Sequence, residues 1–302
     1  MIYRLFFAAL LFPLKGALIR WRANFTPKAQ PVSELPSVDD VQLVSQPRSL
    51  LGMLQRVKTE EGIDGMYKGI LPTLGFLLFW EQMYIPSFMV IAFLHIAEYN
   101  RGTILIIAIV SSIKILATVV ETVLVNRAVT TQEELPSFSL RRALDALLSP
   151  TERKRPYRIF VIPGFLAATT SWVLYIVGTS ALRHFFVIKQ MPEHFENWED
   201  VKSCIPLLVG AIVFSLVLNA LVLTPLEVMI VRLSIQAKAR QPILLLDTTP
   251  DEDHPVGAVR LRTNEDEYTG LINCATLIIR EEGWGVLYRG WWWTAFRGLL
   301  FV

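Results

Sequence analysis

A few ionisable residues lie inside long apolar stretches of this 302-residue chain. Lys114 and Glu121 are seven residues apart, a spacing that puts both on the same face of a helix. Arg297 lies in the apolar stretch at the C-terminus, and Glu81 lies in the one that begins at residue 70. An ionisable group within a membrane-length apolar segment indicates a functional site. Lys114 and Arg297 are therefore candidate binding residues, and Glu81 is the nearest candidate counter-charge.

Each of these cations also has a structural explanation. Lys114 could form an ion pair with Glu81 or Glu121 inside a helix bundle. Arg297 could instead extend its guanidinium group to the lipid headgroups. The residues alone leave both explanations open beside the binding hypothesis.

The sequence contains none of the residue arrangements that carry out catalysis. It has no Ser/His/Asp or Cys/His combination and no phosphate-binding glycine loop, and its four histidines are scattered. Cys204 and Cys274 match no metal or redox spacing. The acidic pairs at 60–61 and 281–282 are interpreted as capping or solvated groups at helix–loop junctions. An enzyme is therefore the least favoured class, and we expect neither a metal nor a cofactor.

The composition favours an all-α membrane protein. Hydrophobic residues make up 53% of the chain and charged residues 19%, against about 25% charged in soluble domains. A net charge of +2, with no basic cluster in a known motif, argues against a nucleic-acid partner. A sixth apolar segment begins at Gly290 and stops with the chain at Val302, too short to span, and we expect this last helix to be truncated. Five segments approach or exceed the length that crosses a bilayer as a helix: 1–20, 70–94, 102–125, 159–188 and 204–231.

Basic residues gather in three of the segments between the spans. Residues 20–68, 127–158 and 232–289 each contain seven Lys or Arg, together 21 of the 29 in the chain. The 187–202 link is instead rich in acidic residues. The positive-inside tendency predicts that the three long segments face one compartment and the short links face the other.

A repeated pattern ends the odd-numbered spans. The segments PLKGALIR (13–20), VVETVLVN (119–126) and PLEVMIVR (225–232) follow one another at two equal intervals, from 13 to 119 and from 119 to 225. Proline inside a helix removes a hydrogen bond, so Pro13 and Pro225 predict kinks that Val119 does not.

The even-numbered spans also begin alike. A tyrosine and a cation precede each one, at 67–68, 157–158 and 288–289, and such pairs suit the headgroup region. Amphipathic stretches at 50–62 and 271–283 predict helices lying along the membrane surface, and 139–150 fits this pattern less well.

Together these two motifs resemble the mitochondrial carrier family: P-x-[DE]-x-x-[KR]-x-[RK] on odd helices, and an acid-Gly pair followed by aromatic-[KR]-Gly before even helices. The resemblance implies a six-helix barrel of three pseudo-symmetric two-helix repeats, with surface helices between paired spans. The repeats would be residues 1–95, 101–188 (degenerate) and 201–302 (C-terminally incomplete). It further implies a multi-pass protein of a mitochondrial membrane, the inner rather than the outer.

In that family, ion pairs between the odd-helix motifs close one end of the barrel. The resemblance puts Lys15, Glu121 and Glu227 at the acid positions of this gate. All three base positions are apolar, at 18, 124 and 230. We therefore expect Lys15 to approach Glu121 or Glu227, because a carboxylate in a dry constriction needs a partner. The motif of the opposite gate is missing at 88–92 and 178–182.

The resemblance also implies a substrate site at mid-cavity. The predicted substrate-binding residues are Lys114, Arg297, Phe76, Ala167 and Glu81. Two cations at that depth favour an anionic solute, because charges in a low-dielectric cleft focus their field.

Two functions follow from these observations. The first is a mitochondrial carrier for a small, anionic solute, with that solute and membrane lipids as its partners. The second is a carrier-derived, non-transporting scaffold or adaptor of the mitochondrial outer membrane, with a role in fusion or membrane dynamics and with protein partners. The segment 225–236 (PLEVMIVRLSIQ) supports the second, because it resembles the carrier-like fusion proteins in lacking the motif's base.

Overall fold

The chain is α-helical, with no β-strand among the residues that the structure describes. This confirms the predicted all-α class. The computed structural model divides into two compact units, Met1–Pro163 with Val231–Glu267 (unit 1) and Gly164–Ile230 with Tyr268–Val302 (unit 2). The described residues are 2–27, 47, 49–79, 101–131, 140–187, 198–239, 259, 261–262 and 267–300.

Helices occupy the five predicted spans and the sixth, shorter apolar segment, as far as these are described. The odd-numbered spans are α1 (Ile2–Ala23), α6 (Arg101–Thr130), and α10 (Trp198–Leu218), which continues through a π turn (Asn219–Leu223) into α11 (Thr224–Ala239). The even-numbered spans contain a helix at 70–79, α9 (Phe165–Val187) after a 3₁₀ turn (Pro156–Val161), and α15 (Trp291–Leu300).

Short helices lie in the described parts of the three long segments, where the amphipathic patterns predict them. They are α3 (Leu50–Glu60) and α4 (Gly62–Met66), α7 (Leu140–Leu147) and α8 (Pro150–Lys154), and α13 (Leu271–Glu281) and α14 (Trp284–Leu287).

Glycines allow the tight turns between these short helices. Gly62 and Gly69 have φ of 72° and 88°, and Gly283 and Gly290 have φ of 100° and 71°. Residues with a Cβ rarely adopt this left-handed region. The spacing within the first pair equals the spacing within the second, so repeats one and three share the same turn geometry.

The two prolines do not end their helices. The helix α1 runs through Pro13 to Ala23. Before Pro225 the α-helical pattern gives way to the π turn, in which the backbone N–H of Thr224 donates to the carbonyl of Asn219, five residues back. The missing N–H of Pro225 accounts for this local change. Neither α6 at Val119 nor α1 at Pro13 has such an interruption, and the predicted kinks stay a prediction.

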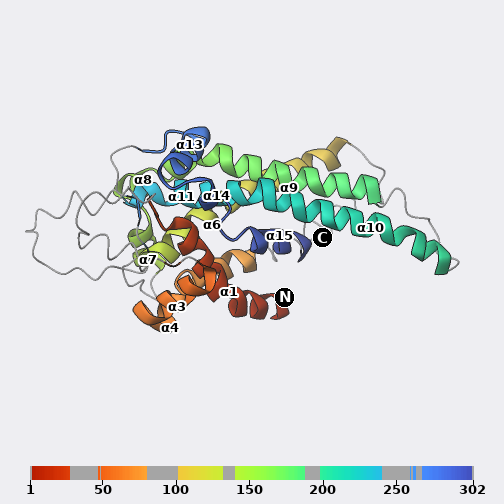
Figure 1. Ribbon diagram of the computed structural model, residues 1–302. Helices are drawn as coiled ribbons and strands as arrows, with labels where there is room; N and C mark the ends of the chain where they lie inside the picture. Colours follow the sequence, from red (N-terminus) through yellow and green to blue (C-terminus); the bar gives the residue numbers. More distant parts are fainter. Residues whose placement is uncertain are drawn as a thin grey trace, which may run out of the picture. The chain divides into compact units, whose positions relative to one another are not determined.

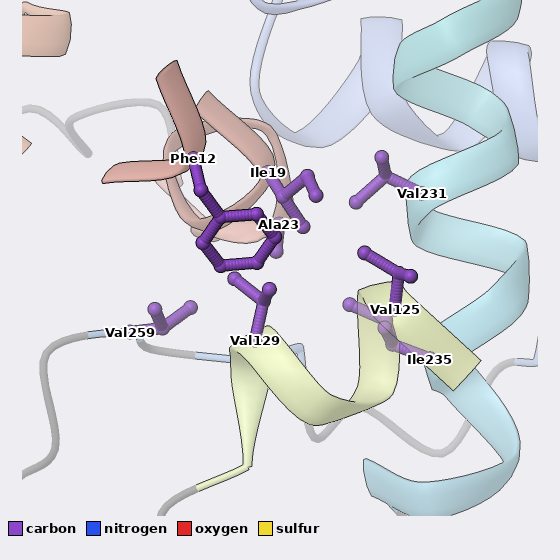
Figure 2. Packing of buried hydrophobic residues seen from close by; sticks show 8 residues of the cluster. All are labelled: Phe12, Ile19, Ala23, Val125, Val129, Val231, Ile235 and Val259. Atoms are coloured by element: carbon purple, nitrogen blue, oxygen red, sulfur yellow. The ribbon is translucent and has the colours of Figure 1, made fainter. Parts of the chain in front are cut away.

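The core of unit 1 joins the ends of the three odd-numbered helices. Figure 2 shows α1, α6 and α11 contributing side chains to one apolar cluster. Its members include two sets of residues at equivalent positions of the three motifs: Ile19, Val125 and Val231, and Ala23, Val129 and Ile235. The interval that separates the motifs in the sequence thus also separates residues that pack together. Phe12 and Val259 complete the cluster.

In unit 2, α9 and α10 run side by side and α15 packs against α10 and the π turn (Figure 1). Among the described residues, one helix, Val209–Gln236, is long and apolar enough to cross a membrane, and only 22% of its most apolar part is buried. Large apolar side chains are exposed along α10 and the π turn. They are Ile205, Val209, Ile212, Val213, Phe214, Val217, Leu221 and Val222.

Candidate functional site

Four buried arginines stand at the ends of the odd-numbered helices. Arg20, Arg127 and Arg232 are each no more than 2% exposed, and Arg22 is 4% exposed. A buried charge is costly unless it is paired and hydrogen-bonded. In unit 1, Arg20 Nη2 lies 2.7 Å from Glu61 Oε2 and also donates to the carbonyl of Gly65 at 2.8 Å. This ion pair links the end of α1 to the junction of α3 and α4.

Arg127 forms the corresponding pair in repeat two. Its Nη1 and Nη2 donate to Oε2 and Oε1 of Glu152 at 2.6 and 2.9 Å, and Nη1 also reaches the carbonyl of Leu147. Such a two-point contact is the strong form of this interaction. Glu152 also accepts from the backbone N–H of Ser149 in a capping box at the start of α8. Burial opposes the charged form of Glu152, but the bonds and charge of Arg127 outweigh it, so the pKa of this carboxyl lies below its usual value.

Further polar contacts join α6 to α11. Asn126 Nδ2 donates to Ser234 Oγ at 2.9 Å, and Arg127 Nε donates to the carbonyl of Ser234 at the same distance. A cation near the C-terminus of a helix stabilises carbonyls that have no partner within the helix.

Contacts of the same kind join α11 to α1. Arg232 Nε and Nη2 donate to the carbonyls of Arg22 and Asn24 at 2.7 and 2.8 Å. The acceptors Arg22 and Ser234 are two repeat intervals apart, whereas the donors Arg127 and Arg232 are one residue short of a single interval. Lys68 Nζ also donates to the carbonyl of Thr131, beyond the end of α6.

At the gate positions the structure combines apolar and polar side chains. Residues 18, 124 and 230, which lack the family's bases, are buried. Glu227 is buried and accepts a hydrogen bond from Thr294 Oγ1 at 2.7 Å, within unit 2. Lys15 and Glu121 are half-buried on α1 and α6. The approach of Lys15 to Glu121 or Glu227 stays a prediction.

The predicted substrate residues are only partly described. Phe76 is half-buried and packs against a second cluster of unit 1, formed by Leu124, Ala128 and Leu147. Ala167 is exposed on α9. Lys114 and Arg297 lie on α6 and α15, but their side chains are outside the described residues, as is Glu81 altogether.

The acidic pairs after the surface helices have a larger role than the sequence suggested. Glu61 does stand at the junction of α3 and α4, but its side chain makes no capping hydrogen bond there. It binds Arg20 instead and lies 3.6 Å from Lys68 Nζ. At the matching position in unit 2, Glu282 lies 4.0 Å from Arg289. The last base of the odd-helix motif was the signal that could have identified the partner of Glu61.

These ion pairs and hydrogen bonds hold helix ends together, which is a structural role. Where the chain is described, no group of three His, Cys, Asp or Glu residues gathers as a metal site would require. No protein-family model matches the chain, and no curated protein matches it either.

Proposed function

We propose that the chain is a divergent mitochondrial carrier that moves a small anionic solute through a six-helix barrel in a mitochondrial membrane. The observation that carries this proposal is the meeting of α1, α6 and α11 in unit 1 through residues spaced by the repeat interval. Three equivalent helix ends in contact are what a threefold barrel closed at one end would have. Two cations from different repeats, Lys114 and Arg297, supply the preference for an anion.

The exposed apolar surface of α10 supports the membrane part of the proposal. Large side chains such as Phe214 and Leu221 are more than half exposed. A soluble protein rarely leaves a long apolar face uncovered. Lipid would cover this face at no cost to the helix, because its backbone groups are bonded within the helix.

The contacts at the helix ends are compatible with opening during transport. The ion pairs of Arg20 and Arg127 with glutamates lie within single repeats and would hold each repeat rigid. The contacts between repeats are mostly hydrogen bonds to backbone carbonyls, each with a net contribution of about 1–3 kcal/mol. Solute binding could offset the loss of a few such bonds.

A cysteine cross-link between α6 and α11 tests this proposal. Asn126→Cys and Ser234→Cys would be combined in a chain with Cys204→Ser and Cys274→Ala, reconstituted in liposomes. We expect uptake of a labelled anion that stops on oxidation and returns on reduction. Either single-cysteine variant, which cannot form this disulfide, serves as the control. Uptake that continues in the fully cross-linked protein would contradict the proposal.

A scaffold is the second candidate, favoured by the apolar, buried residues at the family's base positions. Leu18, Leu124 and Ile230 cannot form the ion pairs that carriers break and re-form. Under this alternative the closed end never opens. Folded, reconstituted protein would then take up no anion in either redox state of the cross-link.

A further inference from the structure

The surface helices of repeats one and three expose large apolar side chains at matching positions. In this region the two repeats are aligned by their Glu-Gly turns, so that position 62 matches position 283. Leu51 therefore matches Ile272, and Ile63 matches Trp284. These side chains are 70%, 80%, 67% and 67% exposed, in the same order.

The opposite faces of the same helices are packed. Met53 and Val57 of α3 are buried in unit 1, and their matches Cys274 and Ile278 of α13 are buried in unit 2. The helices α3 and α13 thus each have a covered apolar face and, at Leu51 and Ile272, an exposed apolar position on another side of the helix. Ile63 and Trp284 stand in the short helices that follow, α4 and α14.

Repeat two has arginines where the other repeats have these apolar residues. It is aligned with repeat one by the tyrosines that precede the even-numbered helices, Tyr67 and Tyr157. Arg141 and Arg153 then stand at the positions of Leu51 and Ile63. Arg153 is exposed, and its Nε lies 3.6 Å from Asp145 Oδ1.

A second set of exposed positions stands at the start of the even-numbered helices. Tyr67 and Tyr157 are exposed at matching positions, whereas Tyr288 in repeat three is half-buried. Four residues further on, Leu71, Val161 and Trp292 are exposed in all three repeats. Tyrosine and tryptophan concentrate where water meets lipid. Every repeat thus has an exposed apolar or aromatic side chain at the start of its even-numbered helix.

We propose that the exposed apolar pairs of repeats one and three insert into the interfacial layer of the bilayer, whereas the surface helices of repeat two stay in water. This inference rests on the membrane location in the proposed function. The partner is a lipid surface, because the pairs continue the exposed tyrosine and apolar positions. An indole such as that of Trp284 also combines an apolar body with a polar N–H. Arginine at the same positions keeps its charged group in water or among the headgroups and supplies no apolar side chain to insert.

Spin labels on single cysteines test the inference. Ile63→Cys, Trp284→Cys and Arg153→Cys would be introduced into the full chain with Cys204→Ser and Cys274→Ala, in phosphatidylcholine–phosphatidylethanolamine liposomes. Collision rates would be measured with oxygen, which partitions into lipid, and with a water-soluble nickel chelate. We expect the labels at 63 and 284 to collide several-fold more with oxygen than with the chelate, and the label at 153 to show the reverse.

A label at Val213→Cys, on the exposed face of α10, tests the proposed membrane location separately from this inference. If residue 213 meets lipid but 63 and 284 meet water, the inference is overturned and the membrane location stands. If all four labels meet water, both are overturned. Unchanged melting temperatures of the labelled proteins would show that the labels report on the folded chain.

Discussion

Arg127 and Glu152 form a buried ion pair in repeat two that corresponds to the pair of Arg20 and Glu61 in repeat one. Each partner stands one residue further along the chain than the position equivalent to its counterpart. Position 20 corresponds to 126 in repeat two, as 13 does to 119, and position 61 corresponds to 151, as 67 does to 157. The pair lies instead at 127 and 152. Repeat two therefore has the same kind of interaction, although its segment 119–126 lacks the proline and the final arginine of the other two segments. The pair again links the odd-numbered helix to the short helices that follow.

Removing one partner of this pair should destabilise the protein strongly. We expect Arg127→Met to lower the free energy of unfolding by about 3–5 kcal/mol, because Glu152 would be left buried without its cation. Denaturant unfolding in detergent micelles, followed by circular dichroism, would measure this.

The matched control is Arg153→Met, in the same segment. The side chain of Arg153 is 44% exposed and its ion pair with Asp145 is at the surface. An exposed pair contributes about 0–1 kcal/mol, so the loss should be small. Equal losses for the two variants would show that the buried pair of Arg127 contributes no more to the free energy of unfolding than the surface pair of Arg153.

Acid should weaken the same interaction. The pKa of Glu152 in the folded protein lies below its ordinary value of 4.5, which it regains on unfolding. The contribution to stability is therefore complete above that ordinary value and is lost as the pH falls through the lower, folded-state pKa. As the pH falls through 4.5 and below, the wild type should lose stability more steeply than Glu152→Gln. Parallel pH profiles would contradict this assignment.

Gly164 should tolerate no side chain. Its φ is +73°, and a Cβ built there would lie 2.5 Å from the backbone N of Leu271, within unit 2. We expect Gly164→Ala to cost about 2 kcal/mol or more, because both the backbone conformation and the close approach of α13 oppose it. A shift in melting temperature would report the loss.

Gly75 provides the control for this substitution. It lies in the helix at 70–79, and a Cβ there meets no other described atom within 4 Å. Alanine favours the helix over glycine by about 0.5–1 kcal/mol, so Gly75→Ala should be neutral or stabilising. A similar loss in both variants would argue against a specific requirement at Gly164.

The positions of the helices could be read from the sequence, because apolar length and periodicity decide them locally. The equal spacing of the three odd-helix motifs also predicted which residues are equivalent, and Ile19, Val125 and Val231 do pack together. The resemblance placed Lys15 and Glu227 in one gate. The structure gives Glu227 a hydrogen bond from Thr294, a residue that no motif singled out.

The polar pairings could not be read in the same way. Which carboxylate meets which arginine depends on how short helices fold back on a long one, and a shift of one residue moves a side chain by about 100° around a helix. The pair of Arg127 and Glu152 departs from the motif in this way, so the motif could not predict it. The proposed role of Lys114 and Arg297 in the choice of solute stays a prediction.

The most direct test of the proposed function is the binding of anions to the purified full-length chain, followed by its melting temperature. A panel of carboxylates, phosphates and nucleotides would be screened, because a ligand at about 100 times its Kd stabilises the folded state by about 2.7 kcal/mol. We predict that one class of anion raises the melting temperature of the wild type and of Lys58→Ala, which removes an exposed cation of α3. Lys114→Ala and Arg297→Ala should melt as the wild type does without ligand and lose the shift. If no anion stabilises the wild type, or if both variants keep the full shift, the account of an anion carrier is contradicted.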